Sequence, residues 1–173
     1  MTLRASLGHL ELRRFSLERA AAEFGAASQL ARSFGTTSLE ALILNNLGIV
    51  HNQRNDFRKA KRCFRRAEGL LERSGERRAV IQIACNLASL AAKTGDANGA
   101  RDRLEQAAHL LAHYPGTRLE FLVGLSRGLV AYFLGDVQTA IEAFQAMVPA
   151  GRKLGDSQFV TYAKIYLVLT PSF

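Results

Sequence analysis

Tryptophan is absent from this sequence of 173 residues, and proline and cysteine are rare, with three and two copies. Because proline interrupts helices, its scarcity favours a chain built from long, regular helices. The two cysteines, Cys63 and Cys85, are too few for a disulfide framework and lack the spacing of a metal site. We expect them to be reduced thiols in a cytoplasmic protein.

Long apolar runs and export signals are also missing. No stretch approaches the ~20 consecutive apolar residues that a membrane-spanning helix requires, and the first residues lack the apolar segment of a secretory signal. Hydrophobic residues make up 48% of the chain, which favours a folded globular protein over disorder. We therefore expect a soluble protein that does not engage a membrane.

Catalytic signatures are absent as well. The sequence holds no nucleophile motif, no glycine-rich phosphate loop and no pair of carboxylates placed for acid–base catalysis. His109 and His113 have the i, i+4 spacing of two metal ligands on a helix, but no third ligand stands at a fixed spacing from them. We predict that the protein is not an enzyme and needs no cofactor or metal.

What the sequence does contain is a unit of forty residues that repeats in register. Four alanines mark it: Ala20, Ala60, Ala100 and Ala140. Four positions after them stand Phe24, Phe64, Leu104 and Phe144, and three positions further on stand Ala27, Ala67, Ala107 and Met147. Because offsets of four and three residues share one face of an α-helix, each unit contains a helix that buries this face.

A second helix precedes this one in every unit. Twelve residues before each alanine stands a small residue: Gly8, Gly48, Ala88 and Gly128. Small side chains at these positions would let the first and second helices of a unit approach closely. Between the two helices, Gly95-Asp96 and Gly135-Asp136 combine a glycine that ends one helix with an aspartate that caps the next.

Signals at the other turns agree with this arrangement. Asn55-Asp56 substitutes for the Gly-Asp pair in the second unit, and Gly35, Gly75 and Gly155 end second helices. Thr37 to Glu40 and Thr117 to Glu120 have the spacing of capping boxes, in which the threonine and the glutamate would cap the helix start.

These patterns predict an all-α protein, an α-solenoid of antiparallel helix pairs with about nine helices. The predicted helices cover about 2–14, 17–34, 38–54, 57–74, 77–94, 97–113, 118–134, 137–154 and 157–169. We expect one domain over residues 1–173, with units at about 1–36, 37–76, 77–116 and 117–156 and a partial fifth unit at 157–173.

The Leu-Gly of the first helix, the Gly-Asp turn and the alanine twelve residues after that glycine resemble the tetratricopeptide repeat. The usual repeat has about 34 residues, and this chain resembles the longer arrays of bacterial transcription activators and peptide-sensing regulators. The resemblance covers nearly the whole chain. It implies a right-handed superhelix with the first helices on its concave side, and a protein- or peptide-binding scaffold within a larger regulatory protein.

The candidate peptide-binding residues lie on the first helices, on the face turned away from the second helices. They are Asn45, Asn46, Ile49, Asn52, Gln82, Asn86, Leu122, Leu125, Ser126, Tyr162 and Tyr166. Asn46 and Asn86 share one position of the repeat, and a carboxamide can pair with both the C=O and the N–H of an extended main chain. By resemblance they would hold a bound peptide's backbone; alternatively, they bond a neighbouring helix or water.

Positive charge gathers on one second helix. The net charge is +8, and the run Arg58, Lys59, Lys61, Arg62, Arg65 and Arg66 lies opposite the apolar face of its helix. This convex basic patch is a solvated surface, a site for an acidic protein partner, or a site for nucleic acid. No aromatic residue stands among the arginines to stack bases, which makes nucleic acid the weakest alternative.

The last predicted helix, 157–169, is apolar nearly all round. Exposed apolar surface usually marks an interface. We therefore expect either that the chain is a piece of a longer repeat protein or that residues 157–173 pack on another subunit. The predicted partners are a protein or peptide segment and, through this end, a second copy.

Overall fold

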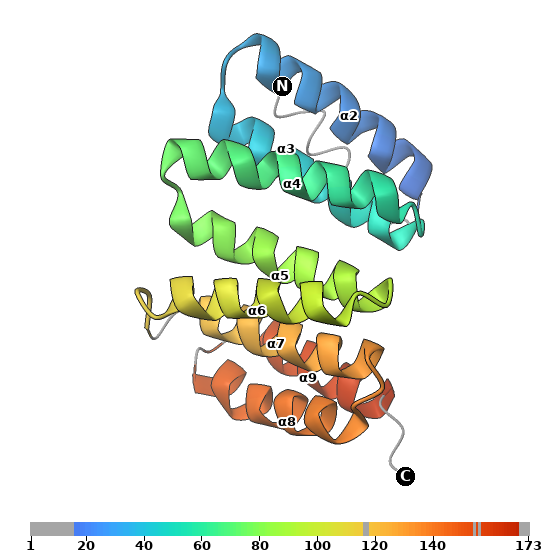
Figure 1. Ribbon diagram of the computed structural model, residues 1–173, viewed down its shortest axis with the longest axis vertical. Coiled ribbons are helices and arrows are strands. Elements are labelled where there is room, and N and C mark those ends of the chain that lie inside the picture. Colours follow the sequence, from blue (N-terminus) through green and yellow to red (C-terminus); the bar gives the residue numbers. More distant parts are fainter. Residues whose placement is uncertain (1–15, 116–117, 154, 156, 170–173) are drawn as a thin grey trace. The chain divides into compact units, whose positions relative to one another are not determined.

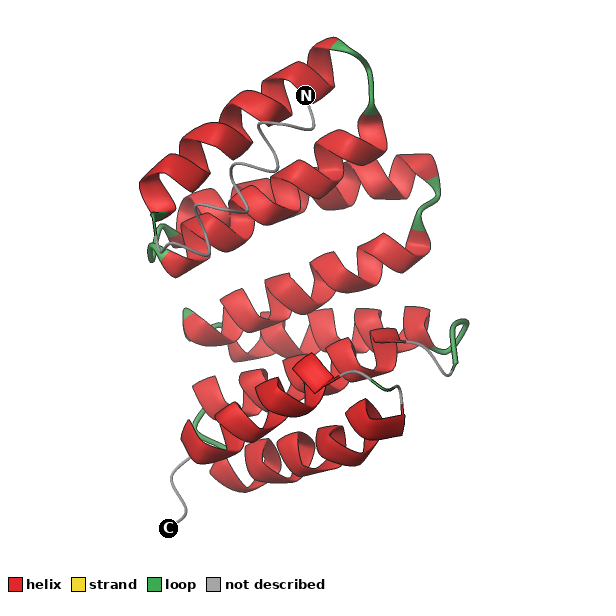
Figure 2. Cartoon of the chain, turned by 180° about the vertical axis from the view of Figure 1, so that it is seen from behind, coloured by secondary structure: helices red, strands yellow, loops and turns green. Residues whose placement is uncertain are grey.

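Eight α-helices make up nearly all of the computed structural model, which describes residues 16–115, 118–153, 155 and 157–169. The helices are α2 (Leu17–Ser33), α3 (Thr37–Gln53), α4 (Phe57–Ser74), α5 (Arg77–Lys93), α6 (Ala97–Leu111), α7 (Arg118–Phe133), α8 (Val137–Lys153) and α9 (Ser157–Leu169). Figure 2 shows only helices and loops over this part of the chain. The predicted all-α class is confirmed, and eight of the predicted helices agree to within about two residues at each end. The ninth, 2–14, lies outside the described residues.

Two compact units divide the chain between Ile83 and Ala84, inside α5. The first unit contains α2, α3 and α4, which lie side by side in Figure 1, together with the beginning of α5. The second contains the remainder of α5 and α6 to α9, in which α8 packs against both α7 and α9. Within each unit, consecutive helices pack as antiparallel pairs, as expected for an α-solenoid.

The core of each unit is built from the small and aromatic residues of the repeat. In the first unit, Phe24 and Ala27 of α2 pack with Ile43 and Val50 of α3. In the second unit, Ala88 of α5, Ala100 of α6 and Val130 of α7 form one cluster. A further cluster joins Ala131, Ala140 and Phe144, with Tyr166 and Leu167 of α9 against it.

The forty-residue register predicted from the sequence holds in three dimensions. The four marker alanines, Ala20, Ala60, Ala100 and Ala140, all have 0% relative exposure. Phe24, Phe64 and Phe144 are also buried, while Leu104 is half-buried. Because the same positions are buried in both units, the pattern identifies which face of each helix is core.

The small residues of the first helices permit close helix contact, as predicted. A Cβ atom built on Gly48 would lie 2.5 Å from the ring of Phe64, and one built on Gly128 would lie 2.4 Å from the ring of Phe144. Such distances are far below a carbon–carbon contact of about 3.5–4.0 Å. Each glycine therefore lets a phenylalanine ring of the next helix lie directly on its backbone.

The turns follow the predicted signals with two exceptions. Asn55 takes the left-handed conformation that glycine takes at Gly95 and Gly135, so it does replace the glycine of the pair, but the Asp56 side chain makes no capping hydrogen bond to α4. The Asp96 carboxylate accepts a hydrogen bond from the Gly99 amide at 2.9 Å, and Asp136 accepts one from the Thr139 amide at 3.1 Å.

The second exception is the predicted capping box of Thr37 and Glu40, which is wrong. α3 starts at Thr37, so the N-cap is Thr36, and its hydroxyl donates to the Ala31 carbonyl at 3.0 Å instead of capping α3. The Glu40 carboxylate instead pairs with Arg32 of α2 and Arg66 of α4. The second predicted box, Thr117 to Glu120, begins outside the described residues.

Candidate functional site

A groove lies where the first turns of α3 meet the end of α4 and the beginning of α5, all within the first unit. Its volume is about 300 Å³. The lining residues are Ser38, Leu39, Ala41, Leu42, Asn45, Leu71, Glu76, Ala79, Gln82 and Ile83. Most of them are apolar, and they come from two first helices and the second helix between them.

The groove combines an apolar wall with a few polar groups. Leu42 is 54% exposed, so its side chain is open to a ligand in the groove. Gln82 is the exposed amide of the lining, whereas Asn45 is only 3% exposed. The Glu76 carboxylate accepts hydrogen bonds from the Ser38 and Ser74 hydroxyls, the latter at 3.2 Å. Such a surface suits an apolar side chain flanked by polar main chain.

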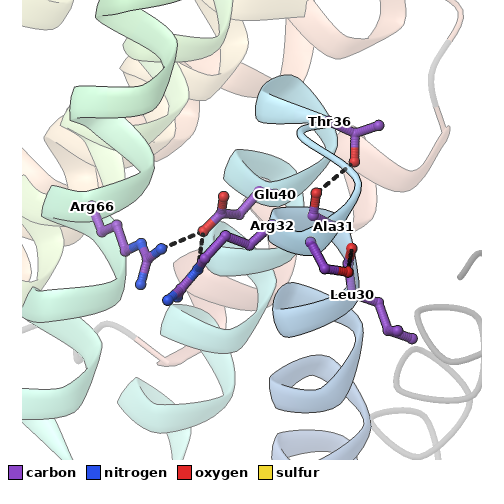
Figure 3. A network of polar contacts seen from close by, with 7 residues as sticks. Leu30, Ala31, Arg32, Thr36, Glu40 and Arg66 are labelled. Carbon is purple, nitrogen blue, oxygen red and sulfur yellow. Dashed lines mark hydrogen bonds and ion pairs between the residues drawn. The ribbon is translucent and has the colours of Figure 1, made fainter.

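A buried carboxylate fixes the helix that carries one wall of this groove. Glu40 of α3 is 5% exposed, and its Oε1 lies 2.5 Å from Nη2 of Arg66 on α4 and 3.4 Å from Nε of Arg32 on α2. Figure 3 shows both guanidinium groups converging on this one oxygen. Buried charges persist only when they are paired and hydrogen-bonded, so this cluster ties α3 to both neighbours.

The structure brings only some of the predicted peptide-binding residues of the first unit to the groove. Asn45 and Gln82 line it, while Asn46, Ile49 and Asn52 are half-buried and do not. The near-complete burial of Asn45 corrects the expectation that its amide faces a ligand freely. Asn46 and Asn52 each have an interaction partner within the fold.

In the second unit, some of the predicted peptide-binding residues are buried in the core and others are half-buried. Leu122, Leu125 and Asn86 are half-buried. Ser126 is buried and hydrogen-bonded to Cys85, which corrects its assignment to a ligand-facing surface. Tyr166 stacks on Phe144 with ring centroids 5.2 Å apart, so its ring contributes to the core. The side chain of Tyr162 lies outside the described residues.

The predicted basic patch on α4 is exposed at all six positions: Arg58, Lys59, Lys61, Arg62, Arg65 and Arg66. Its members nevertheless differ. Arg66 is bound to the buried Glu40, and Lys59 lies 3.9 Å from Asp56. On the described part of the chain, the other four form no ion pair. Like charges at i, i+4 on a helix cost roughly 0.2–0.5 kcal/mol per pair, so this arrangement does not stabilise α4.

Among the described residues, burial shifts the pKa values of one histidine and two cysteines. Burial lowers the pKa of His51 below its ordinary value, although Asp56, 3.6 Å away, opposes this. Burial also raises the pKa of Cys85 to about 11 and that of Cys63 above its usual value. Both thiols are free. These residues lie on separate parts of the fold and show no nucleophile–base pairing.

Among the described residues, no group of three or more His, Cys, Asp or Glu side chains is placed to hold a metal ion. None of the described helices is both long enough and apolar enough to cross a membrane.

Sequence reasoning identified only Asn45 and Gln82 among the ten residues that line the groove. Leu71 and Glu76 were not candidates because only first-helix positions were considered, whereas the groove also uses the end of α4 and the turn after it. The available signal was Leu42, a leucine on the outer side of an otherwise amide-rich helix face. Glu40 was also missed, because a glutamate three residues after a threonine resembles a cap.

Comparison with known proteins does not place the chain in a family. No protein-family model matches the sequence, and a search of curated proteins finds no match.

Proposed function

We propose that this chain is a non-catalytic binding module, of the long tetratricopeptide type, that takes up a peptide or protein segment on its first helices. The observation that supports this proposal is the groove at the start of α3 and α5, with its apolar wall and exposed amide. Stable helices on both sides hold the groove open without a ligand, because Glu40 anchors α3 to α2 and α4. A preformed groove lowers the ordering cost of binding.

The occupant of the groove follows from its lining. An apolar side chain of the bound segment would contact Leu42, Leu39 and Leu71, and Gln82 would pair with a main-chain group beside it. Asn46 lies one helical turn after Leu42 on α3, and its role as a second main-chain contact is part of the proposal. Asn86 would have the corresponding role in the second unit.

The regulatory setting is also proposed. A binding module without catalytic residues acts through whatever domains or proteins accompany it, and the resemblance to long repeat arrays favours a bacterial regulatory protein. We place it in the cytoplasm because both cysteines are free and buried, as in proteins that function under reducing conditions.

A peptide library tests the proposal. A random peptide library is panned on the immobilised chain, and enriched peptides are measured by fluorescence anisotropy against the chain and two variants. Leu42→Asp places a charge in the groove, while Phe34→Asp changes a 72% exposed side chain outside it. Enriched peptides should carry an apolar residue and bind Leu42→Asp at least about tenfold more weakly.

Phe34→Asp is the matched control, because it separates an effect of the groove from an effect of added charge. Phe34→Asp should bind the peptides as the original chain does, since it adds the same charge away from the groove. Equal affinities for Leu42→Asp and Phe34→Asp would contradict the groove as the binding site. Asn46→Ala should also weaken binding of these peptides, and unchanged affinity would remove Asn46 from the proposal.

A further inference from the structure

The repeat register sets α4 apart from the other second helices. Four outward positions of α4 hold Arg58, Lys61, Arg62 and Arg65, all exposed. The residues at the same positions of the other second helices are Glu18, Ala21, Ala22 and Gly25 on α2, Asn98, Arg101, Asp102 and Glu105 on α6, and Gln138, Ile141, Glu142 and Gln145 on α8. These are neutral or acidic except Arg101. The fold therefore does not require cations at these positions, and α4 alone carries four.

The charge of these four residues is not used inside the fold. Among the described residues, Arg66 and Lys59 of α4 form ion pairs. The four cations at the outward positions form none. Their opposite helix face holds the buried Ala60, Phe64 and Ala67. Four uncompensated cations thus form one strip, hereafter the α4 strip (Arg58, Lys61, Arg62 and Arg65).

We propose that the α4 strip binds an acidic helical segment of a partner protein. A helix rises 1.5 Å per residue, so Arg58 and Arg62 are separated by about 6 Å along the axis, and Arg58 and Arg65 by about 10 Å. Glutamates at i, i+4 and i+7 of another helix repeat these spacings. Guanidinium groups bind carboxylates with two parallel hydrogen bonds, and three of the four cations are arginines.

The surroundings of the strip favour a protein over a nucleic acid. Single-stranded nucleic acid is bound by aromatic side chains that stack on its bases. Phe64 is buried and Phe57 is half-buried, so no exposed aromatic ring lies on α4. The strip is also confined to two turns of one helix. Contacts with duplex phosphates would use charge alone and would show no preference for the pattern of the ligand's charges.

Two synthetic peptides of about 20 residues test the proposal. In the patterned peptide, glutamates stand at i, i+4 and i+7 on one face; in the dispersed peptide, the same glutamates are spread around the helix. A duplex DNA oligonucleotide is the third probe. Binding of each labelled probe to the whole chain is measured by fluorescence anisotropy at low and raised salt.

The patterned peptide should bind at least about tenfold more tightly than the dispersed one, and its affinity should fall as salt rises. The double variant Arg62→Glu/Arg65→Glu should lose at least about tenfold of this affinity. Arg101→Glu on α6 reverses one exposed cation at the position equivalent to Lys61 and should leave binding within about twofold. Leu42→Asp, which tests the groove, should also leave it unchanged.

Three results would overturn the proposal: equal binding of the two peptides, full affinity of the double variant, or tighter binding of duplex DNA than of the patterned peptide. Should the double variant lose its helical circular dichroism, Arg62→Gln/Arg65→Gln replaces it, since this change removes charge without adding repulsion. Because the groove variant and the strip variants affect different probes, either proposal can fail while the other stands.

Discussion

The Arg66 guanidinium donates to the buried carboxylate of Glu40 at 2.5 Å, and this bond joins α4 to α3. Arg65, its neighbour in sequence, is exposed and forms no ion pair with the described residues. Two adjacent arginines that look alike in the sequence therefore have different roles. One completes a buried charge cluster, and the other belongs to the α4 strip.

This difference predicts unequal effects on stability. Arg66→Ala should lower the free energy of unfolding by about 1–2 kcal/mol, because it leaves the Glu40 carboxylate with only Arg32 at 3.4 Å. Arg65→Ala should change it by less than about 0.5 kcal/mol, as exposed substitutions do. Urea denaturation followed by circular dichroism measures both. Equal losses in the two variants would show that the Glu40 cluster contributes nothing specific.

Glycine substitutions test the close helix contacts. Gly48→Ala should destabilise the chain by about 1–3 kcal/mol, because its new Cβ overlaps the ring of Phe64. Gly25→Ala is the matched control: none of the described residues outside its own turn of helix lies within 4 Å of its new Cβ, so it should stabilise α2 by about 0.5–1 kcal/mol through helix propensity.

Urea denaturation should show that the free energy of unfolding falls for Gly48→Ala and rises for Gly25→Ala. If Gly48→Ala stabilises the chain as Gly25→Ala does, Phe64 does not pack on the backbone of α3 as described. Gly128→Ala should repeat the effect of Gly48→Ala in the second unit, because its new Cβ would overlap the ring of Phe144.

The lowered pKa of His51 predicts that the free energy of unfolding depends on pH. Burial lowers its folded-state pKa below the ordinary value of 6.5, with smaller effects of Lys59 and Arg54 in the same direction and of Asp56 in the opposite one. Below pH 6.5 the unfolded chain therefore binds more protons than the folded chain, and the free energy of unfolding falls as pH decreases towards the folded-state pKa.

His51→Ala should remove this part of the pH dependence. Alanine is a suitable replacement because Ala91 and Ala131 occupy the equivalent positions of α5 and α7. His109→Ala, which changes an exposed histidine, should retain the fall in stability. Thermal unfolding between pH 5 and 7 measures the three chains. Parallel curves for the original chain and His51→Ala would contradict the burial of a neutral imidazole.

The two thiols should react in a fixed order. Thiolate is the reactive form, and with a pKa of about 11 only about one Cys85 thiol in a thousand is ionised at pH 8. Iodoacetamide should therefore label Cys63 before Cys85 in the folded chain, with both reactions much slower than in urea. Mass spectrometry of the labelled peptides follows the order. Faster labelling of Cys85 would show that its burial is transient.

The helices of this protein were predictable because their signals are local and recur. The left-handed turn at Asn55 and the burial of Ala60 follow from residues that neighbour one another in sequence or share a helix face. The candidate site was less predictable. Asn45 and Gln82 were found from helix periodicity, but Leu71 and Glu76 approach them only after three helices have packed.

The sequence by itself determined the all-α class, the helix boundaries to within about two residues and the buried face of the second helices, since these follow from patterns that recur within one helix or its adjoining turn. Only the tertiary structure decided that Glu40 binds arginines instead of capping α3, that Ser126 is buried, and that Arg66 differs from Arg65. These outcomes depend on distances between side chains of different helices. A periodic pattern specifies the face on which a residue lies, but it carries no information on which atom of the next helix that residue meets.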